Sequence, residues 1–134
     1  MTETDAEIAF LDARMDEDEA AAKVAAGVAG PDWTWETGLS AGEATDYVTG
    51  TDGTLLLDTL GGIESEAPHV ARHDPARVLR EVEAGRALIA EYRRALEKAP
   101  GNRPLLNTLR RLISSRAAVW SDHPDYDPAW RPAP

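Results

Sequence analysis

The chain has 134 residues, the size of one ordinary domain, and we expect residues 1–134 to fold as a single domain around one core. It contains no cysteine, which excludes disulfides, thiolate nucleophiles and Cys-ligated zinc and leaves histidine and carboxylate side chains as ligands for any metal. The formal net charge of −10 at pH 7 argues against non-specific nucleic-acid binding, and the acidic N-terminus, with no apolar stretch of bilayer length, predicts a cytoplasmic protein.

Hydrophobic periodicity predicts a mainly helical α+β fold with four segments, namely an acidic helix (1–27), a small sheet (33–60), helices (63–120) and a tail (121–134). In the first segment, Thr4 followed by Glu7 is typical of a capping box, so the helix is expected from about residue 5 to residue 26, with Gly27 ending it. Apolar residues recur at helical spacing along it: Ile8, Leu11, Met15, Ala22 and Ala26. We interpret the acidic run 16–19 as a solvated face, because it lacks the central glycine of a calcium loop.

A small antiparallel β-hairpin or sheet is predicted over about residues 33–58. Three stretches are rich in β-branched, aromatic or aliphatic residues, namely 33–37, 45–49 and 54–58. Asp52 and Gly53 separate the last two stretches and are typical of a tight hairpin turn. The third stretch has few polar interruptions, so we expect it to pack one face on a helix before Gly61 and Gly62 end it.

The helical segment begins with residues 63–73, which we expect to form a short helix or a turn interrupted at Pro68. Asp74 and Pro75 are then typical of an N-cap and a first helical position. The helix that follows carries a coiled-coil-like seam, in which Gly85 allows a neighbour to approach closely: Val78, Val82, Gly85, Ile89, Tyr92 and Leu96. This seam predicts packing along another helix.

A second long helix is predicted after the break at residues 100–102. It begins near Pro104 and carries its own apolar stripe: Leu106, Leu109, Ile113, Ala117 and Trp120. The two helices are expected to form an antiparallel helical hairpin. The seam around Gly85 also permits a homodimer, although a helix of the same chain satisfies it equally well.

The tail, residues 121–134, contains four prolines and cannot form a regular helix. We expect Tyr126 and Trp130 to lie across the helices and cover the core, while nearby aspartates make turns and pair with arginines. The alternative is that the tail acts as a peptide-like ligand that inserts Trp130 into another protein.

Three long motifs lie at the two ends and in the middle of the chain: FLDARMDEDE at 10–19, HVARHDPARVL at 69–79 and DHPDYDPAWRP at 122–132. Together they resemble a family of short actinobacterial and actinophage proteins known only as a domain of unknown function. Residues 30–66 are similar to that family only loosely. Because the family has no established activity, the resemblance implies a compact accessory protein associated with actinobacteria or their phages, and it assigns no catalytic residue.

All three histidines lie within the last two motifs: His69, His73 and His123. His69 and His73 are four residues apart, which on a helix places both imidazoles on one face, and His123 with a nearby aspartate would complete a site for zinc or another divalent metal. We favour a structural interpretation, in which the histidines hydrogen-bond the backbone and the tail, because Pro68 and the following cap interrupt the helix that the spacing needs. No cofactor is then expected.

Two tryptophans and several arginines are candidate contact residues. We expect Trp33 and Trp35 to lie on opposite faces of their strand, so that one is buried and the other is available to a partner. The basic residues of the predicted helical hairpin include Arg77, Arg80, Arg93, Arg94, Arg110 and Arg111, and four glutamates are interleaved with them. Its surface is therefore mixed rather than a continuous basic stripe, which makes nucleic acid an unlikely partner and another protein the expected one.

The leading functional hypothesis is a non-enzymatic protein-interaction or regulatory module, because no phosphate loop, dinucleotide fingerprint, nucleophile elbow or cysteine nucleophile is present. One alternative is a small metal-dependent enzyme that uses the three histidines. A second is a nucleic-acid-directed factor or DNA mimic, since residues 1–66 hold sixteen acidic and two basic residues. Residues 67–120 hold eleven basic and five acidic residues, so we expect the two charged surfaces to pair within the fold.

Overall fold

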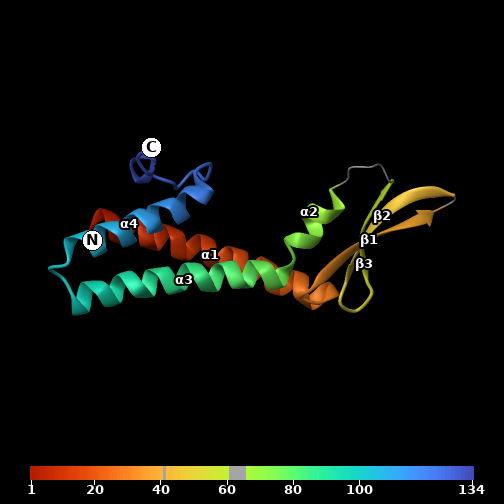
Figure 1. Ribbon diagram of the computed structural model, residues 1–134, viewed down its shortest axis with the longest axis horizontal. Helices are drawn as coiled ribbons and strands as arrows, with labels where there is room; N and C mark the ends of the chain where they lie inside the picture. The colour runs from red at the N-terminus through yellow and green to blue at the C-terminus, as the bar shows by residue number, and fades with distance from the viewer. Residues whose placement is uncertain (41, 61–65) are drawn as a thin grey trace. The chain divides into compact units, whose positions relative to one another are not determined.

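The computed structural model describes residues 1–40, 42–60 and 66–134, which form two compact units. Unit 1 comprises residues 1–17 and 82–134, and unit 2 comprises residues 18–81. The described residues contain four α-helices and one small antiparallel sheet, so the predicted mainly helical α+β fold is confirmed (Figure 1). The single domain over residues 1–134 stays a prediction.

Unit 1 is a helical bundle. Helices α1 (Glu3–Ala29) and α3 (Pro75–Lys98) supply residues to both units, whereas α4 (Arg103–Ala117) belongs to unit 1 alone. The parts of these helices within unit 1 lie side by side (Figure 1) around one apolar core: Ile8, Leu11, Met15, Val82, Ile89, Tyr92, Ala95, Leu106, Leu109 and Ile113. Because burying one large aliphatic side chain stabilises a fold by about 1.5–3 kcal/mol, this core is the main source of stability in unit 1.

The start of α1 differs from its prediction. The hydroxyl of Thr2 accepts from the backbone N–H of Asp5 at 3.1 Å, and the carboxylate of Asp5 accepts from the backbone N–H of Thr2 at 2.8 Å. This reciprocal pair is a capping box, so the prediction that Thr4 and Glu7 form one was wrong. The two bonds to Asp5, first from the backbone and then from the side chain of Thr2, hold the pKa of its carboxyl group below its usual value.

The end of α1 also differs from its prediction. The helix passes through Gly27 and ends at Ala29, so the prediction that Gly27 ends it was wrong. Gly30 has φ of 82°, and its N–H donates to the carbonyl of Ala26 at 2.8 Å. The left-handed backbone at Gly30 is what closes the helix, because that conformation diverts the chain and glycine adopts it without strain.

Helices α3 and α4 begin where the sequence predicted. The carboxylate of Asp74 accepts from the backbone N–H of Arg77 at 2.8 Å, and the side chain of Asn102 accepts from the backbone N–H of Leu105 at 3.2 Å. Each cap precedes a proline in the first helical turn, Pro75 of α3 and Pro104 of α4. The cap predicted at Asp74 and the helix start predicted near Pro104 are confirmed, and Asn102 is the cap of α4.

The seam of α3 packs against α1, and its contact depends on a missing side chain. A Cβ built on Gly85 would lie 2.5 Å from the sulfur of Met15, which is fully buried. The close approach predicted for Gly85 is confirmed. Leu96, at the far end of the seam, is 43% exposed and does not take part in the core.

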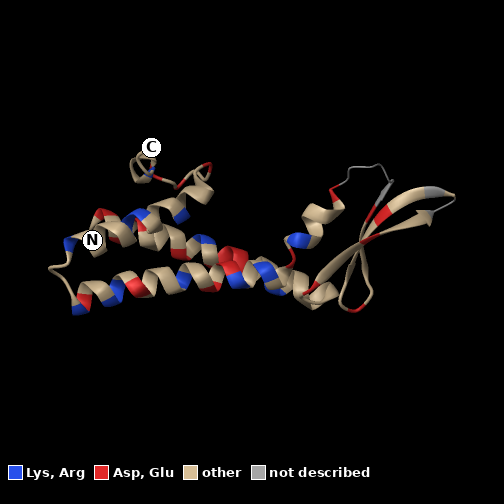
Figure 2. Cartoon of the chain, in the orientation of Figure 1, with Lys and Arg blue, Asp and Glu red and all other residues tan. Residues whose placement is uncertain are grey.

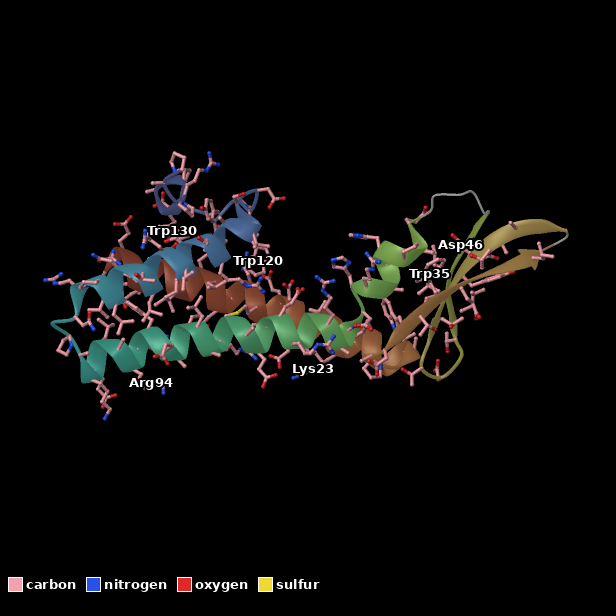
Figure 3. All side chains as sticks on the ribbon, in the orientation of Figure 1. Lys23, Trp35, Asp46, Arg94, Trp120 and Trp130 are labelled. Atoms are coloured by element: carbon pink, nitrogen blue, oxygen red, sulfur yellow. The ribbon has the colours of Figure 1, made fainter. Side chains whose placement is uncertain are left out.

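The tail packs on the helices of unit 1 through aromatic side chains. Tyr126 is 7% exposed and forms a cluster with Phe10 and Ala117. The ring of Phe10 lies 5.8 Å from that of Tyr126 and 5.4 Å from that of Trp130, between centroids. Two 3-10 turns, Ala118–Trp120 and Pro128–Trp130, shape the path of the tail, and Figure 3 labels Trp130 on it beside α4.

Unit 2 contains the predicted antiparallel sheet, with strands β1 (Trp33–Ser40), β2 (Glu43–Gly50) and β3 (Leu55–Leu60) in that order. The hairpin predicted at Asp52 and Gly53 is confirmed, since Gly53 has φ of 83° and the N–H of Gly50 donates to the carbonyl of Thr54 at 3.0 Å. Gly61 and Gly62, predicted to end β3, lie outside the described residues.

Helix α2 (Ala67–Arg72) packs against the sheet. Val48 of β2 is fully buried with Ala67 and Ala71 of α2, while Leu57 of β3 packs against this cluster, so the third strand does pack on a helix. Pro68 lies in the first turn of α2. The prediction that Pro68 interrupts a helical stretch was therefore wrong, because a proline at the first helical positions lacks no hydrogen bond that the helix needs. Residues 63–65 of that predicted stretch lie outside the described part of the chain.

Trp33 and Trp35 lie on the same face of β1. They pair with Gly50 and Val48, respectively, in an unbroken register, and side chains two residues apart in a strand point to the same side. The prediction that they face opposite sides was therefore wrong. Trp33 is half-buried against the cluster around Val48, whereas Trp35 is 45% exposed (Figure 3).

Charged residues are unevenly distributed (Figure 2). Within unit 1, Asp16 of α1 pairs with Arg86 of α3 at 2.7 Å, and Asp12 pairs with Arg93 at 3.8 Å, as expected for acidic and basic segments that pair within the fold. Residues 33–60, which form the sheet, hold five acidic residues and no basic one. Among the described residues, no helix is both long enough and apolar enough to cross a membrane.

Candidate functional site

A cleft of about 720 Å³ opens in unit 1 and is lined by the first turns of α1, by α4 and by the end of the tail. We call it the α1–α4 cleft. Its volume is within the range of about 300–1,000 Å³ that is usual for binding pockets. Six of its residues bear on its chemistry: Glu7 of α1, Arg110, Arg111 and Ser114 of α4, and Trp130 and Arg131 of the tail.

Glu7 is a buried ionisable residue of the cleft. It is 5% exposed because it lies one helical turn before the core residue Leu11, and its Oε1 atom has no hydrogen-bond partner among the described residues. Burial raises the pKa of Glu7 above its usual value, while a hydrogen bond from Ser114 and the positive charge of Arg110 act in the opposite direction. Glu7 is therefore an acceptor that is only partly satisfied within the chain.

Trp130 supplies a donor to the same cleft. Its ring is fixed between aromatic neighbours, at 5.4 Å from Phe10 and perpendicular to Tyr126 at 5.7 Å, between centroids. Its indole Nε1 is buried and, in the described part of the chain, has no acceptor. A buried donor and a buried acceptor without partners are uncommon in a folded protein, because each costs about 1–3 kcal/mol.

The rim of the cleft is mainly basic. Arg110, Arg111 and Arg131 line it and are exposed, and Glu3 is the exposed acidic residue beside them. Because exposed arginines keep their charge and offer a fork of donors, the rim is suited to carboxylates or phosphates. The tail arginine and the two α4 arginines come from distant parts of the sequence.

Behind the cleft, a buried arginine holds the tail. Arg14 is 9% exposed, its Nη2 donates to Glu17 at 2.9 Å, and its Nη1 contacts both ring nitrogens of His123. Its guanidinium also lies 5.4 Å from the ring centre of Phe10. Since a guanidinium can only donate, Arg14 is the donor in its contact with His123.

The predicted metal ligands do not form one group in either unit. His69 and His73 belong to unit 2, with ring centroids 4.2 Å apart, and His123 belongs to unit 1. Nδ1 of His73 is 2.8 Å from the carbonyl of His69, as expected for a structural role. Within residues 1–40, 42–60 and 66–134, no three histidines, aspartates or glutamates are placed to hold a metal ion, and the metal site stays a prediction.

The remaining candidate contact residues lie in unit 2. Trp33 and His73 line a smaller pocket of about 280 Å³, together with alanines of α1. Arg77 donates to Glu81 at 2.8 Å and is half-buried, whereas Arg80 is exposed. Arg77 and Arg80 therefore belong to unit 2, whereas the arginines of the α1–α4 cleft belong to unit 1.

Sequence reasoning missed the two central residues of the cleft. Glu7 was interpreted as a helix cap, although it follows the helical spacing of Ile8 and Leu11 and could have been placed on the buried side by that signal. Trp130 was identified as a contact residue, but its place in the lining of the cleft depends on the path of the tail. No local pattern predicts that path.

Comparison with known proteins finds a family match. The family described as a family of unknown function, DUF6221, matches over residues 4–132 and thus covers the cleft residues from Glu7 to Arg131. No curated protein and no solved structure matches the chain.

Proposed function

The chain belongs to the DUF6221 family, a family of unknown function, and on that premise we propose that it is a non-enzymatic protein-interaction module whose α1–α4 cleft receives a segment of a partner protein. The observation that carries the proposal is that two residues lining an open cleft, Glu7 and Trp130, each hold a buried polar atom, Oε1 and Nε1, without a partner among the described residues. A bound segment would supply a donor to the first and an acceptor to the second. The sequence resemblance alone supports an accessory role in actinobacteria or their phages.

The residues of the cleft are better suited to binding than to catalysis. Its described lining includes a serine whose hydroxyl bonds to Glu7, but it includes neither a histidine nor a lysine. A serine nucleophile is usually activated by one of these bases, and its base is in turn oriented by a third group. A recognition site needs hydrogen-bond donors and acceptors that a partner can satisfy, and it needs no activated nucleophile.

The two alternatives from the sequence have less support. A metal-dependent enzyme would use His123, which contacts Arg14, whereas His69 and His73 belong to the other unit. A DNA mimic would need an acidic surface that is free of basic partners, but Asp12 and Asp16 of α1 pair with arginines of α3. We therefore retain protein interaction as the proposed function.

The proposal is tested by selecting displayed random peptides of about twelve residues on the full chain and measuring their binding by fluorescence anisotropy. Thr108→Trp places a large side chain on the lining of the cleft, and Ser115→Trp places the same side chain on an exposed position of α4 outside it. We expect Thr108→Trp to weaken binding by about tenfold or more and Ser115→Trp to leave it unchanged.

A second lining variant, Asn107→Trp, guards against an effect of Thr108→Trp on folding, and both variants should keep the circular dichroism spectrum of the wild type. If no peptide is selected, or if the selected peptides bind all of these proteins equally, the α1–α4 cleft is not a peptide site and the proposal is wrong.

A further inference from the structure

We infer that the segment bound in the α1–α4 cleft is an acidic peptide in an extended conformation. This inference rests on the proposed function and adds to it the charge and the backbone conformation of the partner. Two independent features of the cleft carry it: the polar atoms of its wall and the arginines of its rim.

The wall favours an extended backbone. Glu7 Oε1 can accept a hydrogen bond and Trp130 Nε1 can donate one, but neither atom has a partner within the described chain. An extended peptide presents N–H and C=O groups in alternation along its length, so one of its N–H groups can donate to Glu7 while a C=O accepts from Trp130. Hydrogen bonds at such water-shielded atoms are stronger than those at the surface.

The last residues of the tail are largely exposed and are not needed to hold the ring of Trp130. Residues 131–134 follow the turn Pro128–Trp130 and are largely exposed, and three of them line the cleft. The ring of Trp130 is held by Phe10 and Tyr126, so it stays in place when the residues beyond it are displaced. A peptide that replaces part of this last stretch would reach both the indole N–H and the carboxylate.

The rim selects the charge of the peptide. Arg110 lies near Glu7 and partly compensates its negative charge, which leaves Arg111 and Arg131 to meet the ligand. Glu3 is the single exposed acidic residue beside them in the described lining. Aspartate or glutamate side chains of the peptide would therefore be attracted to two exposed guanidinium groups.

The same features disfavour nucleic acid. The chain carries a net charge of −10, which repels a long polyanion more than it repels a short peptide. Single-stranded nucleic acids also depend on aromatic faces that stack on bases, whereas the ring of Trp130 already packs on Phe10 and Tyr126. The acidic sheet of a second copy of this chain has the right charge, and the experiment separates that occupant from a partner peptide.

The test uses the peptides selected on the full chain and compares two charge reversals on it. Arg111→Glu changes the rim of the cleft, and Arg103→Glu makes the same change at an exposed position of α4 outside it. We expect the selected peptides to be rich in aspartate and glutamate, to bind Arg111→Glu about tenfold more weakly and to bind Arg103→Glu as they bind the wild type. Replacing the acidic residues of a peptide by Asn and Gln should remove the difference between the two variants.

Glu7→Gln tests the wall. This variant offers a neutral amide in place of the carboxylate, so a peptide whose backbone N–H donates to Glu7 should bind it about three- to tenfold more weakly, with the preference for acidic side chains unchanged. Unchanged affinity in Glu7→Gln would overturn the extended-backbone part of the inference.

The outcomes separate the inference from the proposed function. Neutral or basic peptides that bind the cleft, as shown by their loss in Thr108→Trp, would overturn the inference and leave the proposed function standing. Tighter cleft-dependent binding of a dT12 oligonucleotide, or self-association that Arg111→Glu abolishes in sedimentation, would also overturn it, since the occupant would then be nucleic acid or a second copy. If no selected peptide depends on the cleft for its binding, both the inference and the proposed function are wrong.

Discussion

At the scale of single residues, unit 1 depends on buried polar side chains that work in opposite directions. The two terminal guanidinium nitrogens of Arg14 bond to Glu17 and His123 and tie the tail to α1, while its buried Nε has no partner among the described residues. Glu7 is left with one oxygen unpartnered among the described residues. The bonds of Arg14 stabilise the fold, whereas Glu7, which lines the cleft, keeps an acceptor that a ligand could satisfy.

Replacing Arg14 should destabilise the protein. Arg14→Ala removes the hydrogen bonds to Glu17 and His123 and the packing of the guanidinium on Phe10, so we expect the free energy of unfolding to fall by about 2–3 kcal/mol. Urea denaturation measures it. Arg103→Ala, at an exposed position, should change it by less than about 0.5 kcal/mol, and equal effects of the two changes would contradict the role given to Arg14.

Replacing Glu7 should stabilise the protein in a pH-dependent way. The folded pKa of Glu7 lies above its unfolded value, so its ionisation in the folded state is unfavourable, and that cost is removed as pH falls through the folded pKa. Glu7→Gln should therefore raise the free energy of unfolding by about 1 kcal/mol at pH 7 and by progressively less toward pH 4. The measurement is a series of urea titrations across this range.

Glu83→Gln is the control for that series, because Glu83 is an exposed carboxylate of unit 1 that is not among the charges acting on the pKa of Glu7. It should show no such trend. A gain in Glu7→Gln that is the same at pH 7 and pH 4 would mean that ionisation of Glu7 does not oppose folding.

At the scale of elements, two glycines within helices illustrate how context decides the effect of one residue type. Gly27 in α1 has open space where a Cβ would lie, whereas Gly85 in α3 faces Met15. Both have helical backbone, so neither needs glycine for conformational freedom. The difference between them is entirely one of packing.

The two glycines predict effects of opposite sign. Gly27→Ala should raise the free energy of unfolding by about 0.5–1 kcal/mol, since alanine is the better helix former. Gly85→Ala should lower it by about 1–3 kcal/mol, because the new Cβ would lie 2.5 Å from the sulfur of Met15 and force α1 and α3 apart or Met15 out of its rotamer. Thermal melts of both variants measure this, and stabilisation by both would show that the α1–α3 contact tolerates a methyl group.

At the scale of the whole molecule, the C-terminal tail covers an aromatic residue of α1 and forms part of the lining of the cleft. It covers Phe10 of α1 with Tyr126 and Trp130, and it supplies one wall of the α1–α4 cleft. The motif at residues 10–19 and the motif at residues 122–132 are thus in contact through these aromatic side chains. This explains why aromatic side chains are found in a proline-rich segment that forms no regular helix.

Removing the tail should weaken both stability and binding. A chain that ends at Ser121 loses Tyr126 and Trp130, so we expect the free energy of unfolding to fall by about 3 kcal/mol or more and the selected peptides to lose cleft-dependent binding. A chain that ends at Arg131 keeps both aromatic residues and should keep the stability of the full chain within about 1 kcal/mol. Full stability without Tyr126 and Trp130 would mean that the tail is not part of the core.

Much of the fold could be predicted from sequence, because its signals are local. The cap at Asp74, the start of α4 near Pro104 and the hairpin at Asp52 and Gly53 each depend on residues within a few positions of one another, and the seam around Gly85 repeats every three or four residues. Local signals failed where two candidates competed, as at the two ends of α1. There the predictions that Thr4 caps the helix and that Gly27 ends it were wrong, because Thr2 and Gly30 take these roles.

The amino-acid sequence by itself determined the secondary structure, the fold class and the absence of cysteine chemistry, since propensity, capping and periodicity act between neighbouring residues. Only the tertiary structure decided which polar groups face one another. Glu7, Ser114 and Trp130 meet at one cleft although most of the chain separates the first from the other two, and His123 meets Arg14 instead of the other two histidines. Such contacts depend on how helices and tail pack, and packing is a property of the folded chain that no short stretch of sequence contains.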